Sequence, residues 1–196
     1  MSSAEHPPPP TPSPPTGRAL AAFVVGRGWL TGERAERLTR EARDQSAAIV
    51  AAQADGATLD LARHLRRSGQ LTPGLLLRAL LSGDRAFFAS ALADLAEMAT
   101  ARVQGLMRDP QSAGFAALCE RAGLPAALAP AIRAAVMATR SFAGAPDGRL
   151  SLPVVSAVVD ACEAAGGEQM GKAMALLRRF EAEAAREAAR EETLRA

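Results

Sequence analysis

The sequence is poor in the residues that carry most protein chemistry. It has two histidines, two cysteines and no tyrosine, and aromatic residues make up only 4% of its 196 positions. The cysteines, Cys119 and Cys162, are too few for a disulfide framework and lack the spacing of zinc ligands. Each lies in an apolar helical pattern, so we expect both to be small buried hydrophobic residues.

No motif supplies the groups that acid–base or nucleophilic catalysis needs. His6 lies in a proline-rich tail, and His64 stands alone in LARHLRRSGQL, where its alignment with Phe23 predicts a half-buried structural side chain. The run GGEQMGK at Gly166 lacks both the spacing of a phosphate-binding loop and the Ser or Thr after Lys172. We therefore predict no catalytic residue, no bound cofactor and no metal site.

Long apolar runs and a strong net charge are also missing. No stretch approaches the roughly 20 apolar residues of a membrane span, and the start lacks a basic and then apolar signal peptide. We therefore expect a cytoplasmic protein with no membrane partner. The 23 basic residues are nearly balanced by 21 acidic ones, which leaves a formal net charge of +2. Such a charge creates no global field that would attract nucleic acid.

The chain does contain a proline-rich start followed by helical periodicity. Seven of the nine residues from Pro7 to Pro15 are proline, so we expect residues 1–16 to form a disordered tail, with a PxxP ligand as the alternative. Residues 17–196 are enough for one sizeable core. Because no stretch alternates as a half-buried strand does, we predict a single all-α domain with an extended C-terminal helix.

The clearest helices lie between Leu75 and Leu95. Thr72 is the expected N-cap of the first, with Pro73 at its first position. Gly83 is expected to end that helix in the left-handed conformation, and Asp84 to cap the next. The two helices then form a hairpin, because each carries an apolar face. Its expected core positions are Leu76, Leu77, Leu80, Phe87, Phe88, Leu92 and Leu95.

An internal repeat offers a way to cover the remaining apolar surface. The segment LAAFVVGRGWLTGERAERL from Leu20 aligns without a gap with LARHLRRSGQLTPGLLLRA from Leu61, an offset of 41 residues. A weaker third copy begins at Phe115. A period near 40 is typical of HEAT and armadillo units, although helix-ending glycines recur in any α-bundle. We predict about eight to ten helices, stacked as HEAT-like hairpins or packed as an irregular bundle.

Other signals place the remaining helices. One is expected over residues 99–108, and Pro130 predicts a kink or a fresh helix start. Ser151 is the expected N-cap of the following helix. A last helix is expected over residues 168–194; its apolar positions span barely two heptads, which favours a frayed surface helix over a coiled-coil seam.

The quoted segments also resemble a known family. The run LTPGLLLRALLSGDRAFFASALADLAEMATARVQGLMRD, with the later GFAALCERAGLP, is similar to the bacterial domain-of-unknown-function 2336 family. Members of that family carry a similar leucine-rich helix, Gly-Asp turn, Phe-Phe helix and Ala-Gly-Leu-Pro corner. The resemblance covers roughly Leu61 to Thr139 and extends to the earlier copy from Leu20. It implies an all-helical, HEAT-like protein and adds no catalytic residue.

One local cluster of positive charge remains to be interpreted. Its members are Arg63, Arg66, Arg67, Arg78 and Arg85. The functional interpretation is a patch for an anion or an acidic partner. The alternative is that Arg66 and Arg67 only complement the dipole of a helix that ends before Gly69.

These observations together favour a non-catalytic helical interaction or regulatory adaptor that binds an unidentified partner protein. The alternatives are a small-molecule-binding protein or enzyme whose site is not recognisable from the sequence, and a nucleic-acid binder that uses the arginine patch. An adaptor predicts a broad, shallow binding surface. An enzyme predicts a deep pocket with convergent titratable groups.

Overall fold

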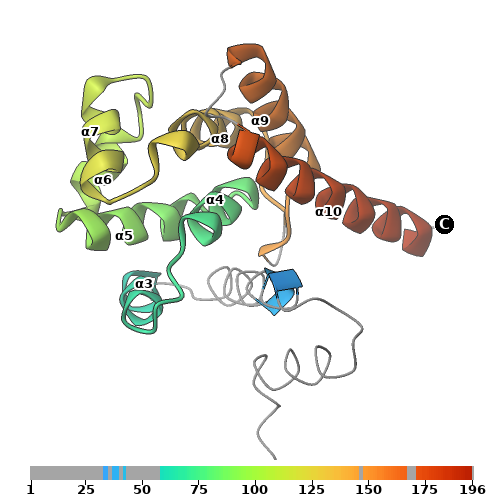
Figure 1. The fold of residues 1–196 in the computed structure, drawn as a ribbon, viewed down its shortest axis with the longest axis horizontal. Helices are drawn as coiled ribbons and strands as arrows, with labels where there is room; N and C mark the ends of the chain where they lie inside the picture. Colours follow the sequence, from blue (N-terminus) through green and yellow to red (C-terminus); the bar gives the residue numbers. More distant parts are fainter. Residues whose placement is uncertain are drawn as a thin grey trace, which may run out of the picture. The chain divides into compact units, whose positions relative to one another are not determined.

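The structure is a computed structural model that describes residues 33–34, 37–39, 42, 58–145, 148–166 and 171–195 (Figure 1). The chain divides into two compact units, residues 1–43 and 44–196, and each is described by itself. In the first unit the described residues are helical. The expected proline-rich tail and the first repeat copy from Leu20 lie outside the described residues. The prediction of one domain over residues 17–196 therefore stays a prediction.

The fold is all-α, as the sequence predicts. Residues 58–145, 148–166 and 171–195 contain eight α-helices, one 3₁₀ helix and no strand. The elements are α3 (Thr58–Arg67), α4 (Pro73–Leu81), α5 (Arg85–Ala96), α6 (Thr100–Leu106), α7 (Ala113–Arg121), η1 (Ala126–Leu128), α8 (Ala129–Ser141), α9 (Leu152–Ala165) and α10 (Gly171–Arg195).

Helix α4 is the centre of the second unit. The Thr72 hydroxyl oxygen accepts a hydrogen bond from the Leu75 backbone N–H at 3.1 Å, and Pro73 occupies the first turn, as expected. All seven residues from Leu75 to Leu81 are buried. A helix that is buried on every side needs neighbours on every side. Helix α4 packs against α5 and against α8 (Figure 1).

Helix α5 forms the expected hairpin with α4. Asp84 caps it, because its Oδ1 accepts a hydrogen bond from the Phe87 backbone N–H at 2.9 Å. Phe87 and Phe88 follow directly and are fully buried in the core. Five further hairpin positions named above contact the same core: Leu76, Leu77, Leu80 and Leu92 are buried and Leu95 is partly buried.

Four helices end in the same local geometry. In each, the residue after the left-handed position donates its N–H to a carbonyl five residues earlier, as in a Schellman motif. These bonds are Gln70 to Leu65 (2.8 Å), Asp84 to Ala79 (2.8 Å), Met98 to Ala93 (2.9 Å) and Leu124 to Cys119 (3.0 Å). Three of the left-handed residues are glycines, Gly69, Gly83 and Gly123. The fourth is Glu97, with φ 51°, a conformation that costs a residue with a Cβ about 1–2 kcal/mol.

A loop after α8 crosses the end of α4 at two glycines. The Ser82 carbonyl accepts a hydrogen bond from the Ala145 N–H at 3.1 Å, and a Cβ atom added to Gly144 would lie 2.5 Å from that carbonyl oxygen. A Cβ atom on Gly83 would lie 2.4 Å from the Gly144 Cα. The two backbones therefore approach as closely as they do only because neither residue has a side chain.

The later helices follow the sequence signals with one change. Helix α8 starts afresh after η1 and carries Pro130 in its first turn, as expected. Ser151 occupies the N-cap position of α9, but its hydroxyl donates to the Ala143 carbonyl at 2.9 Å instead of capping the helix. Helix α10 packs against α9. Its four buried residues are Ala173, Leu177, Phe180 and Ala184.

The packing follows the order of the chain only in part, since α8, α9 and α10 pack consecutively whereas α3 and α4 also contact helices further along. Helix α3 packs mainly on α5, and α4 packs on α8 as well as on α5. In both the second and the third repeat copy, a helix ends at a left-handed glycine and a second helix follows. That the two are copies of one HEAT-like unit stays a prediction.

The glycine crossing predicts a large difference between two otherwise similar substitutions. Gly144→Ala should reduce the free energy of unfolding by about 2 kcal/mol, because the added methyl group meets backbone atoms that have no room to move. Gly105→Ala in α6 should raise it by about 0.5–1 kcal/mol, because that Cβ meets nothing within 4 Å and alanine favours helix. Urea unfolding followed by circular dichroism measures both. Equal midpoints for Gly144→Ala and wild type would contradict the crossing.

Candidate interaction pocket between α3 and α5

The five arginines of the expected patch do not lie together. Arg63 and Arg66 border a pocket between α3 and α5, and Arg67 is exposed on α3 outside that pocket. Arg78 is buried against α10. Arg85 is half-buried at the start of α5, where burial and the nearby Arg140 charge lower its pKa. The five arginines therefore do not form one surface patch, and only Arg63 and Arg66 share a site.

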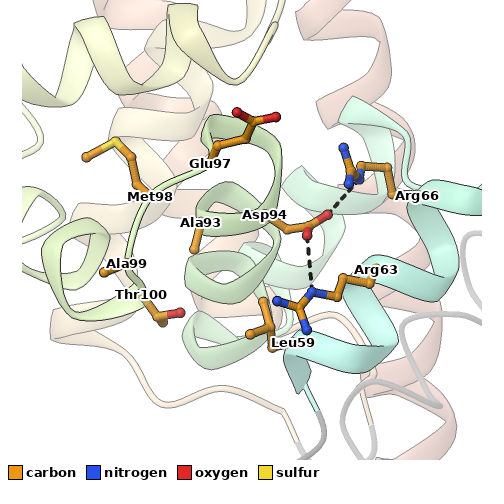
Figure 2. Close-up of a pocket in the computed structure, with 9 residues that line it drawn as sticks. All are labelled: Leu59, Arg63, Arg66, Ala93, Asp94, Glu97, Met98, Ala99 and Thr100. Carbon is orange, nitrogen blue, oxygen red and sulfur yellow. Dashed lines mark ion pairs between the residues drawn. The ribbon is translucent and has the colours of Figure 1, made fainter.

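The pocket has a volume of about 440 Å³ (Figure 2). Helix α3 contributes Leu59 and the two arginines, and α5 contributes Ala93 and Asp94. The rest of the lining comes from the turn after α5 and the start of α6: Glu97, Met98, Ala99 and Thr100. Acidic, basic and apolar side chains thus meet in one place.

Asp94 holds both pocket arginines. Its side chain is 8% exposed, and its two oxygens form ion pairs with the Nε atoms of Arg63 at 3.4 Å and of Arg66 at 2.7 Å (Figure 2). The oxygen that faces Arg66, Oδ2, is buried and has no hydrogen-bond partner, so the contacts are ion pairs and not hydrogen bonds. The arginine side chains are 46% and 49% exposed. One buried carboxylate therefore orients two guanidinium groups at the pocket border, and a guanidinium presents further N–H donors beyond its Nε.

A hydrogen bond strengthens the contact between α3 and α5 close to the pocket. The hydroxyl groups of Thr58 and Ser90 lie 3.0 Å apart at a partly buried position. At the exposed edge, the carboxylate of Asp60 accepts a hydrogen bond from Arg63 Nη1 at 3.4 Å. The positions of Arg63 and Arg66 should depend on the buried contacts more than on this exposed pair, because exposed ion pairs contribute little to stability.

Sequence reasoning missed Asp94 and Glu97. The expected patch consists of arginines alone, whereas the residue that pairs with both pocket arginines is a carboxylate on α5. A signal was available: Asp94 is the one acidic residue within the apolar segment RAFFASALADLA. A charge on such a helix needs a partner once it is buried.

Arg78 is not a surface residue, which corrects its place in the patch. Its side chain is 3% exposed, and it donates from Nη1 and Nη2 to the two oxygens of Glu183 at 3.1 and 2.6 Å. Its guanidinium also lies 5.7 Å from the centre of the Phe180 ring. Burial, bidentate pairing and the aromatic contact identify Arg78 as a structural link between α4 and α10.

Acidic residues continue along α10 from this link. Burial, together with the nearby Glu183 charge, raises the pKa of Glu187, while Arg78, Arg149 and the Leu150 N–H act in the opposite direction. Its Oε2 is buried without a hydrogen-bond partner. One turn further, Glu191 pairs with Arg149. This cluster joins α10 to α4 and to the segment before α9.

The remaining candidate groups that the structure describes are two cysteines and one histidine, and His6 lies outside the described residues. Cys119 and Cys162 are free and buried, as expected. Burial raises the pKa of Cys119 to about 11 and also raises that of Cys162, so both stay thiols near neutral pH. His64 is exposed, which corrects the half-buried interpretation, and the buried residues of α3 are Ala62 and Leu65. Among the residues that the structure describes, no three His, Cys, Asp or Glu side chains are grouped to hold a metal ion.

The fold and the pocket define an all-helical protein with an arginine-bordered pocket between two helices. The chain belongs to the family described as an uncharacterised protein conserved in bacteria (DUF2336), whose model matches residues 16–166. The expected resemblance is confirmed and extends further in both directions, and the pocket lies within the matched range. Searches of the curated proteins and of the solved structures found no match.

None of the helices in the described ranges has the length and hydropathy to cross a membrane.

The raised pKa of Glu187 predicts a pH-dependent effect of Glu187→Gln. A carboxyl whose pKa is raised on folding stabilises the fold below its ordinary pKa, and that stability is lost as pH rises through the folded value. Glutamine removes the charge but keeps an oxygen for the Leu150 N–H. The variant should therefore match wild type near pH 4 and exceed it at pH 7, by up to about 1 kcal/mol after solvent screening.

Unfolding free energies at pH 4, 5.5 and 7 provide the measurement. Glu192→Gln, at an exposed position of the same helix, is the control and should show no such trend. A Glu187→Gln variant that is less stable than wild type at pH 7 would show that the ionised carboxylate is favoured there instead.

Proposed function

We propose that the protein is a non-catalytic interaction or regulatory adaptor, which binds a partner protein through the pocket between α3 and α5. The observation that carries the proposal is the pairing of two half-exposed arginines with one buried carboxylate, Asp94. Arginine is enriched at protein interfaces. Arginines that are already oriented lose less conformational entropy when a partner binds.

The composition of the pocket also favours a partner protein. Leu59 offers apolar contact beside Arg63 (Figure 2), and Met98 adds apolar surface to the lining further from the arginines. Apolar surface with charged groups around it is typical of interface anchors with a polar rim. The lining holds no histidine or cysteine, and of its two acids Asp94 is engaged by two arginines while Glu97 is exposed. This composition favours binding over nucleophilic catalysis.

A small-molecule-binding protein is the alternative that a specific observation supports. A volume of about 440 Å³ falls within the range of small-ligand sites, which is about 300–1,000 Å³. A nucleic-acid binder is less favoured, because the five arginines of the expected patch are not gathered on one surface.

Two finer expectations belong to the same proposal. The helices from α3 to α4 and from α7 to α8 are two copies of one HEAT-like unit, which is supported by their shared helix ends at Gly69 and Gly123. The protein acts in the cytoplasm, which is supported by two free, buried cysteines.

Affinity purification of tagged protein from native lysate tests the proposal. A partner recovered with wild type should be lost, by at least about tenfold, with Arg63→Ala/Arg66→Ala, because the oriented donors are gone. Arg67→Ala is the matched control, since Arg67 is exposed on the same helix outside the pocket. Asp94→Asn is a second variant, which keeps both arginines but removes the charge that orients them.

Two outcomes would contradict the proposal. Equal recovery of the partner with Arg63→Ala/Arg66→Ala, in a variant that melts as a folded protein, would exclude the pocket as the contact. Cross-links from the recovered partner that map away from residues 59–100 would do the same.

A further inference from the structure

Glu97 is the exception among the four equivalent helix ends. At the other three, glycine occupies the left-handed position with φ between 68° and 90°. Glu97 adopts φ 51° at the end of α5, where glycine would be unstrained. A strained residue that the local structure does not require is a reason to look for a function.

The side chain of Glu97 has no role in ending the helix. The cap is made by backbone groups, since the Glu97 N–H donates to the Ala93 carbonyl and the Met98 N–H donates to the same carbonyl at 2.9 Å. Glu97 is exposed, and its carboxylate makes no hydrogen bond or ion pair with another described residue. Glu97 therefore adds to the pocket lining a negative charge that no residue in the described part of the chain pairs with.

The pocket consequently presents two kinds of charge. Figure 2 shows the Glu97 carboxylate at the end of α5, while both guanidinium groups come from α3 and meet at Asp94. The arginines can receive an anionic group with the N–H donors beyond their Nε atoms. Glu97 can receive a cationic group, and Leu59 and Met98 can contact an apolar group.

We infer that Glu97 is a ligand-binding residue of this pocket, and that the partner segment which enters it carries an acidic and a basic side chain close together. This inference rests on the proposed function, because it specifies the partner of the same pocket. Glu97 is retained in place of glycine because its charge selects the basic group. The fold is correspondingly less stable than it would be with glycine at this position.

Three variants and four peptides test the inference. The probes are the blocked tripeptides Lys-Leu-Glu and Glu-Leu-Lys, and the same peptides with glutamine in place of lysine. They are titrated into the ¹⁵N-labelled full chain, and amide shifts of residues 59–66 and 94–100 report binding. At least one lysine peptide should bind wild type about fivefold more tightly than its glutamine counterpart, which is the effect of one favourable ion pair.

The variants separate the effect of the Glu97 charge on peptide binding from the effect of its backbone conformation on stability. Glu97→Gln keeps the side-chain length and should reduce the fivefold preference to about one. Glu97→Gly should reduce it equally and also raise the Tm by about 2–4 °C, because the strain is relieved. Arg63→Ala/Arg66→Ala should weaken all four peptides, since each carries glutamate.

The results also distinguish this inference from the function on which it rests. A preference for lysine that survives Glu97→Gln, or saturable shifts with none of the peptides, would overturn the inference. If either result is obtained and Arg63→Ala/Arg66→Ala still loses the lysate partner, the proposed function stands and only the role of Glu97 is wrong. A Glu97→Gly variant that is no more stable than wild type would show that no strain is retained, which also overturns the inference.

Discussion

The ion pair between the buried Arg78 and the partly buried Glu183 is the interaction on which the second unit most depends. Every residue of α4 from Leu75 to Leu81 is buried, and Arg78 is the only charge within that stretch. Removing such a charge from water is unfavourable unless a partner meets it. The partner comes from α10, 105 residues away in the chain. The pair therefore requires α4 and α10 to fold together, and apolar packing of α10 on α9 extends the same core.

The candidate pocket derives its geometry from this core. Phe87 and Phe88 hold α5 in the core beside α4, and α3 is held on α5 by packing and by the contacts of Asp94 and Ser90. The arginines are thus placed by a rigid helix pair and not by a loop. A binding site built on packed helices keeps its geometry better than one built on loops. The same arrangement explains how α5 can tolerate the strained Glu97 at its end, since the preceding turns are buried.

Sequence reasoning succeeded where the cause is local and failed where it is distant. The caps at Thr72 and Asp84 and the left-handed Gly83 follow from chemistry within four or five residues, so they could be predicted. The arginine patch could not, because Asp94 and Glu183 lie 31 and 105 residues from Arg63 and Arg78. The sequence around Arg78 nevertheless indicates that this arginine is buried, since it follows three leucines in a helix that is apolar on all sides. The role of Glu97 depends on backbone conformation, which the sequence does not reveal.

A double-mutant cycle between Arg78 and Glu183 tests the central claim most directly. Arg78→Met, Glu183→Met and the double variant are compared with wild type by urea unfolding at pH 7. Glu183→Met should lose about 2–4 kcal/mol, because the buried Arg78 is left without its partner, and Arg78→Met should lose less, because the Glu183 side chain is 25% exposed. The double variant should recover much of that loss, with a coupling of at least about 2 kcal/mol. Additive effects, or single changes that each cost less than about 0.5 kcal/mol, would contradict the account.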